Sequence, residues 1–106
     1  MNNILKPHAP IDPEHIFVAD SPTSLGSMLG YNLAEPEDGI LVSRPVYGRF
    51  ELDYGVESGV RMVYADTTAE EAFSPACVEN YERALKECGK EIRAVLLVNP
   101  HNPVGK

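Results

Sequence analysis

Short apolar runs alternate along the chain with stretches in which apolar residues recur every three or four positions. The apolar runs predict β-strands. They cover residues 15–19, 40–43, 60–65 and 92–98. The intervening stretches predict helices. These helices run from Ser21-Pro22 to Leu33, from Tyr47 to Val56, and from Ser74-Pro75 to Cys88. This order predicts an α/β fold with a mostly parallel sheet, flanking helices and right-handed crossovers.

The two ends of the chain differ from this repeating pattern. Residues 1–14 are polar and marked by prolines, which predicts that one domain over 1–106 opens with a connecting segment, followed by strand–helix repeats over 15–106. The run at 92–98 is continuously apolar, which favours a strand covered on both faces. No helix follows it before Lys106, so we expect a partial domain that is truncated at its C-terminal edge.

Composition and charge narrow the class of protein. Hydrophobic residues make up 43% of the 106 residues, as in ordinary globular proteins. The formal charge of −7, from 9 Lys+Arg and 16 Asp+Glu, argues against nucleic acid as the main partner. The longest apolar run, Ala94–Val98, is too short to cross a bilayer, and the N-terminus has no apolar signal segment. We therefore expect a cytoplasmic protein without a membrane partner.

Two cysteines and two glycines fall at informative positions within the predicted helices. Cys77 and Cys88 would lie roughly 16 Å apart along one helix, too far for a disulfide, so both are expected to be reduced. The three histidines show no metal-ligand spacing. Gly26 and Gly30 lie one turn apart, which favours close packing of another segment against that helix.

Three strand ends carry residues that could bind a ligand, because ligands of parallel α/β sheets bind at the carboxyl ends of strands. Ser21, Pro22 and Thr23 begin a helix whose N–H groups could hold a phosphate, although alone they are more simply an N-cap. Tyr47 could stack on a flat heterocycle, or pack in the core. Asn102 offers an amide from a loop with two Asn-Pro pairs. We expect Thr23, Tyr47 and Asn102 to converge around one open cleft.

The loop at 99–105, Asn-Pro-His-Asn-Pro-Val-Gly, resembles the NPxNPxG signature of class I/II aminotransferases. These enzymes have fold type I and use pyridoxal 5′-phosphate (PLP). Further landmarks of the family are similar to residues 6–14, 33–38 and 44–50, in the right order. The resemblance is greatest to the 1-aminocyclopropane-1-carboxylate synthase-like branch. It implies a partial PLP-binding large domain and an amino-acid substrate.

The resemblance also implies a role for each candidate residue. Asn102 would hydrogen-bond the 3′ oxygen of PLP, and Tyr47 would stack on its pyridine ring. Ser21, Pro22 and Thr23 fall on the family's phosphate loop, where Thr23 matches the family and the other two depart from it. A cis peptide is expected at Asn102-Pro103.

In the family, the Schiff-base lysine, the aspartate facing the pyridine nitrogen and the substrate-binding arginines all follow this signature. The resemblance therefore implies that the chain alone is inactive. A second hypothesis is a non-catalytic α/β remnant that binds an intact relative or forms a homo-oligomer through an exposed sheet edge. An unrelated nucleotide-binding module is disfavoured, because the sequence has no glycine-rich phosphate motif.

Overall fold

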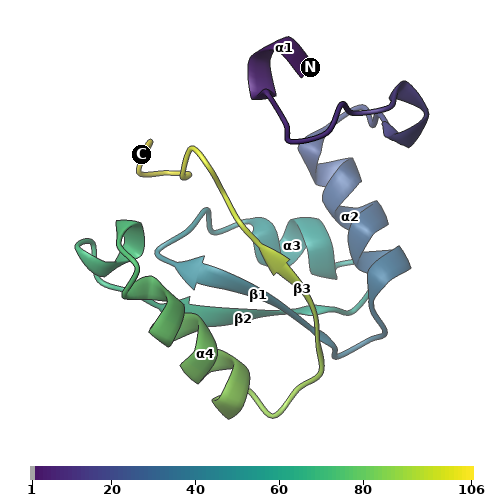
Figure 1. Cartoon of the computed structure of the whole chain (residues 1–106). Coiled ribbons are helices and arrows are strands. Elements are labelled where there is room, and N and C mark those ends of the chain that lie inside the picture. The colour runs from purple at the N-terminus through teal and green to yellow at the C-terminus, as the bar shows by residue number, and fades with distance from the viewer. Residues whose placement is uncertain (1) are drawn as a thin grey trace.

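The computed structural model describes residues 2–106, so Met1, part of the predicted connecting segment, lies outside the described residues. A three-stranded, all-parallel sheet is flanked by helices (Figure 1), which confirms the predicted fold class. The α-helices are α1 (Asn2–Leu5), α2 (Pro22–Leu33), α3 (Phe50–Gly55) and α4 (Cys77–Glu87). The strands are β1 (Gly39–Arg44), β2 (Arg61–Asp66) and β3 (Ile92–Leu96). Short 3-10 helices cover Pro13–His15 and Glu71–Phe73.

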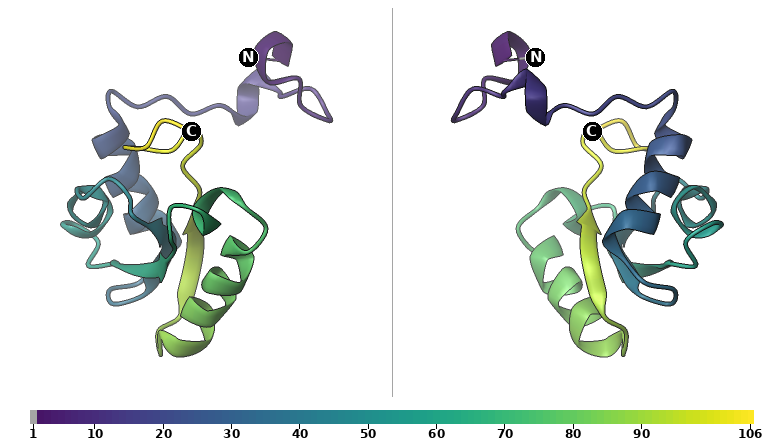
Figure 2. Two further views of the ribbon diagram at one scale, coloured as in Figure 1. Left: turned by 90° about the vertical axis from the view of Figure 1, so that its left-hand side faces the viewer. Right: turned by 90° about the vertical axis from the view of Figure 1, so that its right-hand side faces the viewer.

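The core lies around β1, the central strand of the order β2-β1-β3. Leu41 and Val42 are fully buried there, and Leu41 lies opposite Val63 of β2 and Val95 of β3. Helix α4 covers one face of the sheet, while α3 and α2 lie on the other (Figure 2). The apolar residues of the central strand are thus covered from both sides, as is typical of a strand with a continuous Ile-Leu-Val run.

Residues 15–19 do not form the predicted strand, and this prediction was wrong. His15 closes a 3-10 helix that begins after Asp12, whose side chain accepts a hydrogen bond from the Glu14 N–H at 3.0 Å. The following residues are not in a strand, and Phe17 and Val18 are 71% and 82% exposed. An apolar run becomes a strand only where a neighbour takes its backbone hydrogen bonds. No strand of the described residues pairs with this one.

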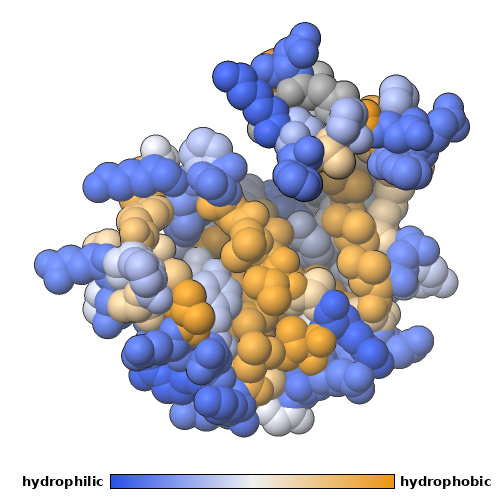
Figure 3. Space-filling view, viewed as in Figure 1, coloured by the Kyte–Doolittle hydropathy of each residue, from blue (hydrophilic) through white to orange (hydrophobic). Residues whose placement is uncertain are grey.

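The prediction that the last strand is covered on both faces was also wrong. β3 ends at Leu96 rather than at 98, and its burial alternates: Ile92, Ala94 and Leu96 are half-buried, whereas Arg93 and Val95 are exposed. β3 pairs only with β1 and is therefore an edge strand. Figure 3 shows hydrophobic side chains gathered along the middle of the face seen in Figure 1, and large apolar residues such as Val95 remain exposed.

The other predicted elements are present, with shifts at their ends. The second predicted helix begins at Phe50 instead of Tyr47, which leaves Tyr47 in the turn after β1. The third predicted helix begins at Cys77, and the loop between β2 and this helix contains the 3-10 helix Glu71–Phe73. Cys77 and Cys88 are both free, as predicted, and both are half-buried. Between residues 2 and 106, no helix could span a membrane and no cluster of potential metal ligands occurs.

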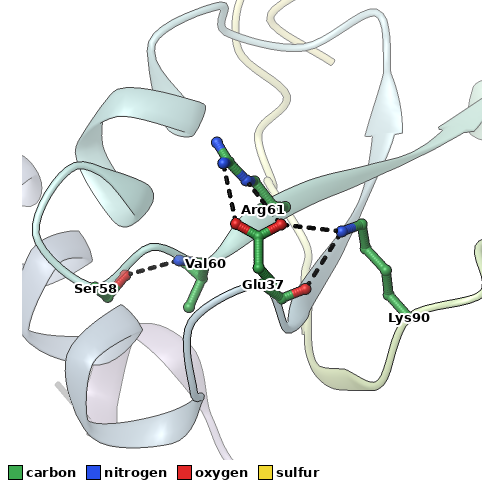
Figure 4. A network of polar contacts seen from close by, with 5 residues as sticks. All are labelled: Glu37, Ser58, Val60, Arg61 and Lys90. Carbon is green, nitrogen blue, oxygen red and sulfur yellow. Dashed lines mark hydrogen bonds and ion pairs between the residues drawn. The ribbon is translucent and has the colours of Figure 1, made fainter.

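A polar network joins the amino ends of the strands, away from the predicted cleft (Figure 4). The Glu37 carboxylate accepts a hydrogen bond from the Arg61 guanidinium at 3.1 Å, and the Lys90 ammonium lies 3.5 Å from it. The hydrogen bond from Arg61, supported by its charge, holds the pKa of Glu37 below its ordinary value. Asp38 pairs with Arg93 at 2.9 Å in the same way. These exposed ion pairs join the amino ends of β1, β2 and β3, and their role is structural.

Candidate functional site

A cleft of about 380 Å³ lies between three segments that are far apart in the sequence. The segments are the start of α2, the turn and helix after β1, and the loop after β3, which reaches toward α2 in Figure 2. The lining residues are Pro22, Thr23, Leu25, Tyr47, Phe50, Asp53, Tyr54 and Asn102. The expected convergence of Thr23, Tyr47 and Asn102 is therefore present. Of the five candidate residues, only Ser21 does not line the cleft.

Tyr47 stands at one end of a row of aromatic rings on the cleft wall. Its ring packs edge-on against Phe50, with centroids 5.4 Å apart, and Phe50 packs in the same manner against Tyr54 at 6.0 Å. Phe50 and Tyr54 also pack against the core, whereas Tyr47 is 38% exposed. The row fixes the Tyr47 ring from one side, and its remaining surface can accept a flat ligand.

Asn102 is held close to Tyr47 by a backbone hydrogen bond. The Tyr47 N–H donates to the Asn102 carbonyl at 3.1 Å, which joins the loop after β3 to the turn after β1. The Asn102-Pro103 peptide is cis, as expected, and Asn99-Pro100 and Arg44-Pro45 are cis as well. The Asn102 carboxamide is exposed and makes no hydrogen bond within the described residues. Its donor and acceptor atoms can therefore serve a ligand.

The start of α2 has few free backbone donors. Ser21 is the N-cap, and its hydroxyl accepts a hydrogen bond from the Ser24 N–H at 3.0 Å. The Leu25 N–H donates to the Ser21 carbonyl at 3.0 Å. Pro22 has no N–H group. The Thr23 N–H is the one backbone donor of this first turn without a partner among the described residues. Ser21 thus takes the structural N-cap role that its sequence position also allowed.

Sequence reasoning missed Asp53, the one acidic residue of the cleft wall. It is only 9% exposed, and its carboxylate accepts a hydrogen bond from the Thr23 hydroxyl at 3.3 Å. Burial raises the pKa of Tyr54, and the negative charge of Asp53 raises it further. The sequence did contain a signal for Asp53, because Asp53 follows Phe50 by three residues and so lies on the same helix face. The contact with Thr23, thirty residues away, was not visible in the sequence.

Comparison with known proteins agrees with the resemblance drawn from the motifs. The family "Aminotransferase class I and II" matches residues 2–106. The chain is 32% identical to the probable aminotransferase gliI of Aspergillus fumigatus over 98% of its own length and 26% of that protein. It is 30% identical to 1-aminocyclopropane-1-carboxylate synthase 7 of Arabidopsis thaliana over 99% of its own length and 24% of that protein. It thus spans about a quarter of the length of these relatives. With this match and the ordered landmarks, the chain belongs to the aminotransferase class I and II family.

Proposed function

We propose that this chain forms one wall of a cofactor cleft in a PLP-dependent enzyme that acts on amino acids. The observation that carries the proposal is the convergence of an exposed aromatic ring, an unpaired carboxamide and a helix start around one cleft. The family generally uses PLP, which supplies an electron sink for amino-acid chemistry when it is bound. The relatives with printed activities include both aminotransferases and 1-aminocyclopropane-1-carboxylate synthases, so transamination and elimination are both open to the family.

The residues of the cleft fit the ring end of PLP. A pyridine ring can stack on the exposed face of Tyr47, a contact worth about 0.5–1.5 kcal/mol beyond area burial. The Asn102 carboxamide comes from the loop that the Tyr47 N–H holds in place, so it can reach a polar group on the edge of the same ring. A hydrogen bond to a charged oxygen there contributes about 1.5–3 kcal/mol.

The residues at the start of α2 fit the phosphate end of PLP less well. The start of α2 offers only the N–H groups of Ser21 and Thr23, and the Thr23 hydroxyl already donates to Asp53. No Lys or Arg lines the cleft. We therefore assign a ring-binding role to Tyr47 and Asn102. Ser21, Pro22 and Thr23 shape the helix start and supply at most two backbone donors, the N–H groups of Ser21 and Thr23.

Binding of the ring can be tested with pyridoxine, which lacks the aldehyde and so cannot react with lysines. Added to the ¹⁵N-labelled chain, it is expected to shift the amide resonances of Tyr47, Asn102 and Thr23. The substitution Tyr47→Ala should weaken this binding by up to about tenfold, the factor for about 1.4 kcal/mol. Tyr31→Ala is the matched control, because Tyr31 is 73% exposed on α2 and does not line the cleft. Equal effects of the two substitutions would contradict the proposed ring site.

We further propose that the chain alone does not catalyse turnover, because none of Lys6, Lys86, Lys90 and Lys106 lines the cleft. Treatment with PLP and borohydride, followed by peptide mapping, is expected to give scattered, substoichiometric labelling. Accessible amines react with an aldehyde without a binding site, so the labelling pattern should be similar in the urea-unfolded chain, which is the control. A single stoichiometric adduct that forms only in the folded chain would contradict the proposal.

A further inference from the structure

We infer that the cleft discriminates against the 5′-phosphate, so that this chain binds the pyridoxine ring without its phosphate at least as tightly as with it. Asp53 is the residue that sets this preference. The inference rests on the proposed function, because it concerns the same cleft. It goes further in assigning a specificity-determining role to a side chain outside the family motifs described above.

The start of α2 lacks the donors that an anion would need. A helix start binds phosphate through several free N–H groups, because the first-turn amides of a helix have no partners within the helix. In α2, local structure leaves few of these N–H groups free. Pro22 contributes no N–H, the Ser24 N–H donates to the Ser21 hydroxyl, and the Leu25 N–H donates to the Ser21 carbonyl. A phosphate would find only the N–H groups of Ser21 and Thr23.

An anion in the cleft would also meet the negative charge of Asp53. The Asp53 carboxylate lies on the cleft wall, about nine-tenths buried, and accepts the hydroxyl hydrogen bond of Thr23. That hydrogen bond removes the second donor that Thr23 could offer a phosphate. No ion pair to Asp53 is present within the described residues, and no Lys or Arg lines the cleft. The negative charge of Asp53 is therefore not neutralised by a neighbouring cation.

Repulsion between Asp53 and a phosphate would be large enough to measure in a binding constant. Two like charges about 4 Å apart repel by an amount that changes a binding constant about fivefold, even when water screens them fully. Burial of Asp53 reduces that screening and strengthens the repulsion. Stacking on Tyr47 and the Asn102 carboxamide do not depend on the phosphate. The ring therefore keeps its contacts in this chain, while the phosphate adds repulsion and at most two hydrogen bonds to backbone N–H groups.

The test compares pyridoxine with pyridoxine 5′-phosphate, which differ only in the phosphate. Each is titrated into the ¹⁵N-labelled chain at low salt, and the dissociation constants are obtained from the amide shifts. In the unmodified chain, the phosphate ester is expected to bind no more tightly than pyridoxine. Asp53→Asn keeps an oxygen for the Thr23 hydroxyl and should tighten binding of the phosphate ester by about fivefold or more. Its effect on pyridoxine should stay within about twofold, since pyridoxine carries no phosphate charge.

Two further variants make the test specific to this cleft. Pro22→Ala restores an N–H at the start of α2 and should also favour the phosphate ester over pyridoxine. Glu57→Gln is the matched control, because it removes one negative charge from an exposed carboxylate that binds the Ser27 hydroxyl and does not line the cleft. It should leave the ratio of the two dissociation constants unchanged. Circular dichroism spectra establish that each variant is folded.

The outcomes separate this inference from the proposed function. If the unmodified chain binds the phosphate ester more tightly than pyridoxine, this inference is overturned and the ring site stands. Equal changes in Asp53→Asn and Glu57→Gln would overturn the role of Asp53. Failure of both compounds to shift the cleft resonances would overturn the proposed function, and this inference with it.

Discussion

Replacing Leu41 by alanine is expected to lower the free energy of unfolding by about 2–5 kcal/mol, the usual cost of truncating a buried leucine. Leu41 is fully buried in the middle of the central strand, so the lost methyl groups leave a cavity between the sheet and its helices. Domains are stabilised by only about 5–15 kcal/mol in total. The variant should therefore unfold at a much lower urea concentration, measured by circular dichroism.

Val95→Ala is the matched control for Leu41→Ala. Val95 lies directly opposite Leu41 in the sheet but is 52% exposed on the edge strand β3. Removing its methyl groups takes away little buried surface, so the free energy of unfolding should fall by less than about 1 kcal/mol. Similar losses in the two variants would contradict the exposed position of β3 and would mean that its outer surface is covered in solution.

Gly30→Ala is expected to destabilise the protein by about 1–3 kcal/mol, although alanine normally stabilises a helix by about 1 kcal/mol relative to glycine. A Cβ atom at position 30 would lie 2.4 Å from the backbone carbonyl oxygen of Tyr54 and 3.0 Å from the Ser58 hydroxyl. The same carbonyl accepts the Ser58 hydroxyl hydrogen bond at 2.7 Å. Helices α2 and α3 would have to move apart, which urea unfolding should report.

Gly48→Ala serves as the control for Gly30→Ala, because an added Cβ there would meet no atom within 4 Å. Its stability should stay within about 0.5 kcal/mol of the unmodified protein, as for other surface substitutions. A gain of stability in Gly30→Ala would show that α2 and α3 are not in close contact. That contact also matters for the cleft, since it places Asp53 and Tyr54 of α3 beside the start of α2.

The two glycines of α2 show how far a local pattern can lead. Their spacing of one turn predicts close packing, and both are buried against α3, with an added Cβ at Gly26 only 3.2 Å from the Asp53 carbonyl oxygen. The pattern does not identify the partner. Only the folded chain shows that the partner is the helix that carries Asp53, because helix docking depends on contacts between residues distant in sequence.

The sequence by itself determined the features that depend on neighbouring residues. Periodicity located β1, β2, β3 and the three longer helices within a few residues, since each element is set by the alternation of its own side chains. The Asn-Pro loop identified the family and drew attention to Asn102. Tyr47 was found because the carboxyl ends of parallel strands gather at one edge of a sheet. Thr23 was assigned to the cleft from a predicted strand at 15–19 that does not form, although the residue does line the cleft.

Tertiary structure alone decided the features that depend on a distant partner. Residues 16–19 have a strand-like composition but no neighbouring strand, so they stay unpaired. The apolar residues of β3 are half-covered because it lies at an edge, which periodicity cannot reveal. Asp53 enters the cleft because α3 packs on α2, and there its carboxylate takes the Thr23 hydroxyl. Side-chain pattern is a local property, whereas pairing, burial and the charge within a cleft arise from contacts between separate segments.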